Sequence, residues 1–212
     1  MNLLFDLDGT LTDPYEGITK SIAHALTSLG RPSPSRMDLR WCIGPPLKKS
    51  FSILLETEDE ILVEKALTIY RERFGSIGLF ENKVYPGIPG ALKNLGEMGH
   101  TIHLATSKPR IFARRIVEHF NLDQYFNSIH GSELDGTRTD KTSLIAYILH
   151  HESLDSSATA MVGDRKHDMI GARANGVWGV GVLWGFGSKK ELTDSGAGAC
   201  IQNPSDLAAS FI

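Results

Sequence analysis

Two aspartates one residue apart, directly after an apolar run, are the residues of this chain that point most clearly to chemistry. Asp6 and Asp8 follow Leu3, Leu4 and Phe5, and a Gly-Thr pair comes next. A carboxylate buried without a partner is costly, so either the pair is solvated or a cation lies on it. Side chains at positions i and i+2 of an extended chain point to the same side. Both carboxylates can therefore face one site.

Another apolar run ends in acids. Asp164 follows the strand-like stretch ATAMVG, and Asp168 comes four residues later, one helical turn further and on the same face. Mg²⁺ prefers oxygen ligands and keeps several of its waters. Two or three acids together with a substrate phosphate would suit it. Asp6, Asp8, Asp164 and Asp168 are therefore the candidate metal ligands.

Hydroxyl and cationic side chains follow two further apolar runs. Thr106 and Ser107 end the run at 101–107, and Lys108 comes next. Hydroxyls and backbone N–H groups near a helix N-terminus can bind a phosphate, and Lys141, which opens a later helix, is a suitable partner for a phosphoryl oxygen. Taken singly, such residues are more often helix caps or solvated charges. Together they fall where open α/β sheets bind ligands, at the carboxyl ends of separate strands.

The elements that must position these residues alternate along the chain. Strands are predicted at 3–7, 101–107, 128–131, 158–164, 177–184 and 198–201. Helical patterns lie between them at 88–99, 109–121, 140–151 and 166–176. Strand-helix alternation is typical of the α/β class, a parallel sheet with helices on both faces.

Residues 14–84 interrupt this alternation. The stretch 14–30 and the stretch 50–75 have helical spacing, and no convincing strand occurs between them. Proline-containing segments mark both ends of the insert. We therefore expect a core domain of residues 1–13 and 85–212 and a small all-helical domain of residues 14–84.

Charge, apolar stretches and the spacing of cysteines and histidines argue against several kinds of function. The chain of 212 residues has a net charge of −3 and no block of like charge, so nucleic acid is not an expected partner. No apolar stretch is long enough for a membrane span, and no leader pattern precedes the first strand. Cys42 and Cys200 have no metal spacing, and the eight histidines form no zinc motif. These features indicate a cytoplasmic protein with reduced cysteines.

Four segments resemble the motifs of the haloacid dehalogenase superfamily of phosphohydrolases, in the order of that family. They are FDLDGTLTD at 5–13, ATSKP at 105–109, Lys141, and GDRKHD at 163–168. The resemblance implies a Rossmann-like core with a small helical cap. Longer strings are similar to the phosphoglycolate phosphatase-like group, and within it to bacterial 5′-nucleotidases: IGPPLKKSF, VYPGIPG, GDRKHDMIGARANG and VLWGFGSKKEL.

The resemblance also implies roles. Asp6 would be the nucleophile that forms an aspartyl-phosphate, and Asp8 would be the general acid and then the general base. Mg²⁺ would bind Asp6, the backbone carbonyl of Asp8, and Asp164, with Asp168 in support. The expected phosphate-binding residues are Leu7, Gly9, Thr106, Ser107, Lys108 and Lys141.

The expected activity is Mg²⁺-dependent hydrolysis of a small phosphorylated metabolite, with phosphoglycolate or a nucleoside 5′-monophosphate as the leading substrates. Within the family that the chain resembles, Asp8 favours a phosphatase or a phosphomutase, because dehalogenase relatives lack this aspartate and P-type ATPase relatives have threonine there. A sugar phosphomutase of the β-phosphoglucomutase type remains an alternative, as does a binding module without turnover. The sequence leaves monomer and homodimer open.

A proline-rich segment of the insert is the candidate for substrate selection. Gly44, Pro45, Pro46 and Leu47 form a stiff stretch ahead of a helical pattern. A cap that closes over a small active site must present groups that contact the substrate. The same segment also suits a plain turn between helices.

Overall fold

Six short strands pair in parallel in the main sheet of the structure, a computed structural model that describes residues 1–211. Their order across the sheet is β5-β4-β1-β6-β7-β8. The strands are β1 (Asn2–Phe5), β4 (Thr101–Pro109), β5 (Ser128–Ser132), β6 (Thr159–Gly163), β7 (Trp178–Val182) and β8 (Ala199–Ile201). The central strands are almost wholly buried, as expected for a parallel sheet covered on both faces. The predicted α/β fold is confirmed.

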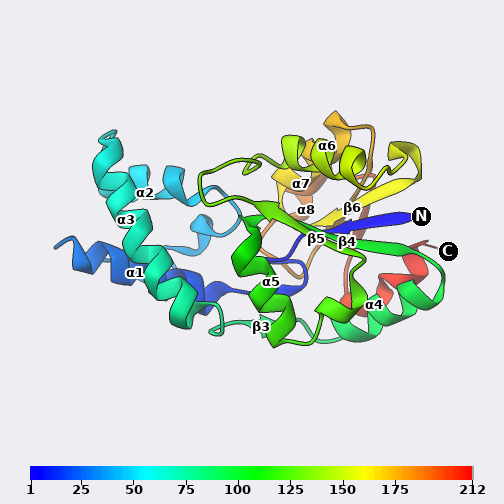
Figure 1. Cartoon of the computed structure of the whole chain (residues 1–212), viewed down its shortest axis with the longest axis horizontal. Helices are drawn as coiled ribbons and strands as arrows, with labels where there is room; N and C mark the ends of the chain where they lie inside the picture. Colours follow the sequence, from blue (N-terminus) through cyan, green and yellow to red (C-terminus); the bar gives the residue numbers. More distant parts are fainter. Residues whose placement is uncertain (212) are drawn as a thin grey trace. The chain divides into compact units, whose positions relative to one another are not determined.

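Helices connect successive strands of this sheet and cover its faces. They are α4 (Ile88–Glu97), α5 (Arg110–His119), α6 (Lys141–His151), α7 (Lys166–Ala174) and α8 (Lys189–Asp194). Figure 1 shows α6 and α7 on one face, with α4 and α5 on the other. On the first face, Leu4, Ala105 and Met161 of three neighbouring strands pack with Leu144 and Ile148 of α6. This burial of apolar side chains holds the helices in place.

The register of the central strands brings their carboxyl ends together. Phe5 at the end of β1 is aligned with Leu104 of β4 and Val162 of β6. The next residue, Asp6, still donates its backbone N–H to Val162 O at 2.9 Å. Side chains that follow β1, β4 and β6 therefore emerge side by side at one edge of the sheet.

Several predicted strands have different ends in the structure. β1 ends at Phe5 rather than at 7. β4 runs to Pro109 rather than 107, and its pairing with β5 is irregular between Thr106 and Pro109. Gly131 permits the close approach of the chains there, because a Cβ at this position would lie 2.6 Å from the carbonyl oxygen of Lys108. β7 ends at Val182 rather than 184, since the chain then turns into a loop.

The chain divides into two compact units, Met1–Asp13 with Val84–Ile212, and Pro14–Lys83. Val84, which the sequence analysis places in the insert, thus belongs to the first unit. The second unit contains α1 (Tyr15–Ser28), α2 (Leu47–Leu55) and α3 (Glu60–Arg73). The short strands β2 (Thr12–Asp13) and β3 (Lys83–Val84) pair with each other.

Aromatic packing holds the second unit together. Tyr70 of α3 stacks on Phe74 and meets Phe51 of α2 edge-on. Between these helices, Asp59 caps α3 by accepting the N–H of Ile61. In the described residues, no helix combines the length and the apolar character that a membrane span requires.

Candidate active site

A buried lysine lies between two aspartates at the carboxyl edge of the sheet. Lys141, the first residue of α6, places its Nζ 3.0 Å from Asp6 and 2.8 Å from Asp168. The same nitrogen donates to the carbonyl oxygen of Ala105 on β4 at 2.9 Å. Burial alone would lower the pKa of Lys141, but the charges of Asp168 and Asp6 outweigh it and raise that pKa. The lysine is therefore a fixed positive charge.

Three carboxylates converge at this point. Asp6, Asp164 and Asp168 each offer one oxygen, and these oxygens all lie within 4.8 Å of one another. Asp164 is completely buried; its Oδ2 accepts the backbone N–H of Phe186 at 2.7 Å, whereas its Oδ1 has no hydrogen-bond partner in residues 1–211. A buried aspartate that has an unpartnered oxygen and lies beside two other acids is the kind of ligand that a cation needs.

The charges of this group do not balance within the protein. Burial raises the pKa of Asp164 well above its usual range, and the charges of Asp168 and Asp6 raise it further. Burial also raises the pKa of Asp168, to about 6, against the opposing charge of Lys141. A divalent cation with oxygen ligands would relieve this repulsion, so the residues present fit Mg²⁺.

We expect Asp164→Asn to abolish stabilisation by Mg²⁺ without destabilising the metal-free protein. The amide oxygen can still accept the Phe186 N–H, while the repulsion from Asp6 and Asp168 is reduced. In thermal unfolding, millimolar Mg²⁺ should raise the midpoint of the wild type but not that of the variant. Asp194→Asn, at an exposed position of α8, is the control and should keep the wild-type response. An unchanged Mg²⁺ shift in Asp164→Asn would contradict the metal assignment.

The Asp8 carboxylate lies apart from this group and contacts a different lysine. Lys108 Nζ is 2.7 Å from Asp8 Oδ2 and 2.8 Å from Oδ1, and both side chains are largely buried. Burial raises the pKa of Asp8, although the charge and hydrogen bond of Lys108 act in the opposite direction. Lys108 thus holds Asp8 in this structure, and its predicted contact with a phosphate stays a prediction. A metal contact through the Asp8 carbonyl stays a prediction.

The turn after β1 brings the backbone of Gly9 close to the Asp164 carboxylate. The Leu7 carbonyl oxygen accepts the N–H groups of Thr10, Leu11 and Thr12 at 2.9 to 3.2 Å, which closes the turn tightly. Gly9 has φ +84°, and a Cβ on it would lie 2.2 Å from Asp164 Oδ2. Only glycine both adopts this conformation readily and leaves room for Asp164.

Two predicted phosphate-binding residues, Thr106 and Ser107, lie near the end of β4. Thr106 is buried, and its hydroxyl accepts the backbone N–H of Lys108 at 3.2 Å. The Ser107 carbonyl oxygen accepts the Ser132 hydroxyl at 2.8 Å. These bonds hold the bend that follows Thr106. Contact of Leu7, Gly9, Thr106 and Ser107 with a phosphate stays a prediction.

The segment Gly44–Leu47 belongs to the second unit. Gly44 has φ +103°, and Pro46 precedes α2, which begins at Leu47. The segment is thus the turn that leads into α2. A role in substrate selection stays a prediction.

The loop after β7 also belongs to the site, which the sequence did not predict. Trp184 donates its indole N–H to the Thr10 carbonyl oxygen at 2.9 Å. A Cβ at Gly185 would lie 2.5 Å from Asp164 Oδ2, and one at Gly187 would lie 2.0 Å from the Asp164 carbonyl oxygen. The two glycines around Phe186 are the available signal, because such pairs permit close backbone approach.

Comparison with known proteins finds a family model and several relatives that match most of the chain. The sequence model for haloacid dehalogenase-like hydrolases matches residues 3–182. A protein of Pseudomonas aeruginosa named 5′-nucleotidase is 51% identical over 193 residues, covering 90% of this chain and 86% of that protein. A crystal structure described as a predicted phosphatase from Clostridium acetobutylicum is 41% identical, with a TM-score of 0.94, and covers 99% of this chain and 96% of that one.

A further relative has a different name. The tyrosine-protein kinase PtkA of Mycobacterium tuberculosis is 37% identical over 185 residues, which cover 87% of this chain and 62% of that protein. Proteins named 5′-nucleotidase and tyrosine-protein kinase therefore share this region.

Proposed function

We propose that this chain, a phosphatase that belongs to the haloacid dehalogenase-like hydrolases, hydrolyses small phosphate monoesters through a phosphorylated Asp6. The observation that carries the proposal is the convergence of Asp6, Asp164 and Asp168 around Lys141. A carboxylate nucleophile divides one difficult displacement into two easier steps.

In the first step, a carboxylate oxygen of Asp6 attacks phosphorus while the bond to the ester oxygen breaks. Asp8, protonated, donates its proton to the departing oxygen. Lys141, held by Asp168, offsets charge on the phosphoryl oxygens. When bound, Mg²⁺ supplies positive charge that reduces the repulsion between Asp6 and an anionic phosphate.

In the second step, Asp8 acts as a base. Its carboxylate, now ionised, removes a proton from water as the water oxygen attacks phosphorus. The bond from phosphorus to Asp6 breaks, so inorganic phosphate leaves and both aspartates return to their starting states. The same residue can serve both steps because the proton that it loses in the first step is regained in the second.

Lys108 is placed to keep Asp8 in position, and we expect Lys108→Met to affect substrates unequally. An ester with a poor leaving group needs the proton from Asp8 in the first step, so its kcat/KM should fall about tenfold or more. p-Nitrophenyl phosphate has a good leaving group, so its kcat/KM should fall less. Comparing kcat/KM for an alkyl phosphate and p-nitrophenyl phosphate checks this, because kcat/KM excludes the second step that all substrates share, with Lys189→Met at the exposed start of α8 as the control. Equal losses for both substrates would contradict the role of Lys108.

The substrate class is tested by phosphate release from a panel of small esters, with and without Mg²⁺. The panel contains nucleoside 5′-monophosphates, phosphoglycolate and sugar phosphates. The resemblance to the Pseudomonas aeruginosa protein supports nucleoside 5′-monophosphates, so we expect the highest kcat/KM for that class. Conversion of a sugar phosphate to its isomer without release of phosphate would favour a phosphomutase. No turnover of any ester would overturn the proposed function.

A further inference from the structure

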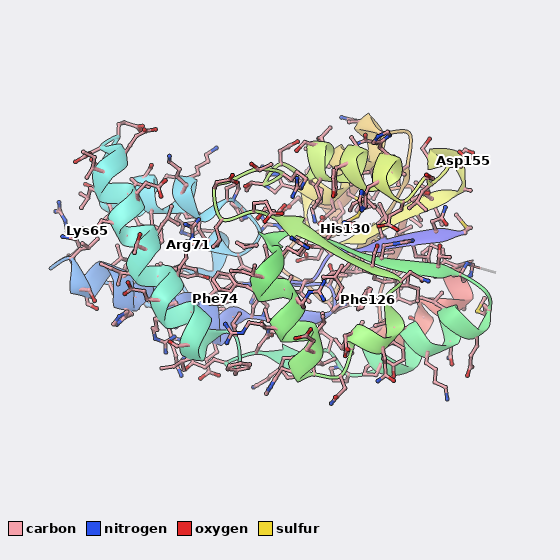
Figure 2. The ribbon with its side chains drawn as sticks, in the orientation of Figure 1. Lys65, Arg71, Phe74, Phe126, His130 and Asp155 are labelled. Atoms are coloured by element: carbon pink, nitrogen blue, oxygen red, sulfur yellow. The ribbon has the colours of Figure 1, made fainter. Side chains whose placement is uncertain are left out.

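A second group of potential metal ligands lies away from the catalytic edge of the sheet. His103 of β4 is aligned with Ser128 of β5, and His130 lies two residues further along β5, on the same face. Glu152 directly follows α6 and reaches the same place. Figure 2 labels His130 on the part of the sheet beside α6.

Short contacts join these four side chains in a row. The Ser128 hydroxyl lies 2.7 Å from His103 Nδ1 and 2.8 Å from His130 Nε2. His130 Nε2 also lies 2.9 Å from Glu152 Oε1. One imidazole nitrogen thus contacts both the serine and the glutamate. A Ser-His-acid triad needs the two ring nitrogens to take different partners, so this arrangement is not a hydrolase triad.

Hydrogen bonds satisfy these contacts incompletely. A contact between His130 Nε2 and an ionised Glu152 requires the proton on that nitrogen. The contact between the same nitrogen and Ser128 must then share that proton, while the Ser128 hydroxyl donates to His103 Nδ1. The ring proton of His103 then lies on Nε2, which is buried and has no hydrogen-bond partner in the described chain. Hydrogen bonds thus leave one proton shared and one donor unpaired, whereas a cation could bind a nitrogen of each ring and the Glu152 carboxylate directly.

We propose that His103, His130 and Glu152 form a binding site for a divalent transition metal of the zinc class. One ligand atom of each residue lies within 4.8 Å of the other two. Two imidazole nitrogens and one carboxylate oxygen are a common ligand set for zinc. The catalytic acids offer only oxygens, which suits a harder ion. The two sites would therefore select different metals.

The surroundings agree with metal binding. Burial lowers the pKa of both His103 and His130, which favours the neutral rings that bind metals. A tetrahedral ion with bonds of about 2.1 Å holds its ligand atoms about 3.4 Å apart. His130 Nε2 and Glu152 Oε1, now 2.9 Å apart, must therefore separate slightly, and the His103 nitrogen must lie at a similar distance from both. The Glu152 side chain, 25% exposed, has room to move and gives the ion access from solvent.

This site is separate from the catalytic group, although α6 reaches both. Lys141 begins α6, and Glu152 follows its last residue. Eleven residues of helix span about 16 Å, so the two sites lie at opposite ends of α6. A bound ion would link β4, β5 and the end of α6. Of these elements, β4 carries Thr106 and α6 begins with Lys141.

Zinc binding to the full-length Asp164→Asn variant tests the proposal, because that change weakens the catalytic metal site. Zn²⁺ is titrated in millimolar Mg²⁺ against a chromophoric chelator, and Co²⁺ absorption reports the ligand geometry. We expect one equivalent of zinc, and an affinity at least about tenfold weaker after adding either His130→Ala or Glu152→Gln. Glu152→Gln keeps the size of a partly exposed side chain, so it remains informative if His130→Ala does not fold.

Two control variants separate metal binding from a chain of hydrogen bonds. His119→Ala removes an exposed histidine of α5 and should leave zinc affinity unchanged. Ser128→Ala removes the shared hydroxyl but none of the three proposed ligands, so zinc affinity should stay within about threefold, while a hydrogen-bond chain would be broken. No zinc binding at micromolar concentration, or equal affinity in the parent and the Glu152→Gln variant, would overturn the proposal.

Discussion

Asp6→Asn is expected to lower turnover by about 10³-fold or more while the protein stays folded. The amide has nearly the shape of the carboxylate but is a far weaker nucleophile. It also lacks the negative charge that would face a metal ion. Both effects act on the same step, so the loss should appear with every substrate of the panel.

The fold should tolerate this change for a local reason. The amide oxygen can still accept the hydrogen bond of Lys141, which keeps its second partner, Asp168, at 2.8 Å. Removing one of three mutually repelling carboxylates also reduces their repulsion. The midpoint of thermal unfolding should therefore stay within a few degrees of the wild type. A large decrease would mean that the Asp6 charge is structural.

The covalent step can be observed directly. In Asp8→Asn, p-nitrophenyl phosphate can still phosphorylate Asp6, because its leaving group needs no proton, whereas the water reaction lacks its base. Rapid quenching and mass spectrometry should then find one added HPO₃ group on the peptide that contains Asp6. The double variant, with Asp6→Asn added, is the control and should show none. Phosphate on another residue, or wild-type turnover in Asp6→Asn, would refute the nucleophile assignment.

The sequence predicted most of the fold because its patterns are local. Each central strand is an apolar run that ends at a polar residue, and a buried parallel strand needs that pattern. The acids Asp6 and Asp164 mark two of these ends directly. The irregular end of β4 could not be predicted. β4 continues past Thr106, where Gly131 of β5 permits a close approach of the two strands. This contact depends on residues that are distant in the sequence.

Pairing between distant side chains also could not be predicted from the sequence. Lys108 follows a phosphate-binding pattern, and its contact with Asp8, which is distant in the sequence, could not be read from that pattern. His103 and His130 have no metal-motif spacing, and only the register of β4 with β5 places them together. Spacing reveals ligands that share one helix or loop, whereas sheet register is set by the whole fold.

Lys141→Met is expected to impair both stability and catalysis. Lys141 is almost completely buried and contacts Asp6 and Asp168. Removing one partner of a buried ion pair leaves uncompensated charge and costs about 3–5 kcal/mol. The two aspartates, with Asp164 beside them, would then repel one another without the lysine. In catalysis, the loss of positive charge near the phosphoryl oxygens should lower kcat about 10²-fold or more.

The stability effect of Lys141→Met should depend on magnesium. In a metal-free solution the free energy of unfolding, measured by urea titration, should fall by the full amount. Saturating Mg²⁺ supplies charge to the same carboxylates and should recover part of the loss. Lys93→Met is the control, because Lys93 forms an exposed ion pair with Glu97 on α4, and such pairs contribute less than about 1 kcal/mol. If Lys141→Met changed stability as little as Lys93→Met, the buried lysine would not be what neutralises these acids.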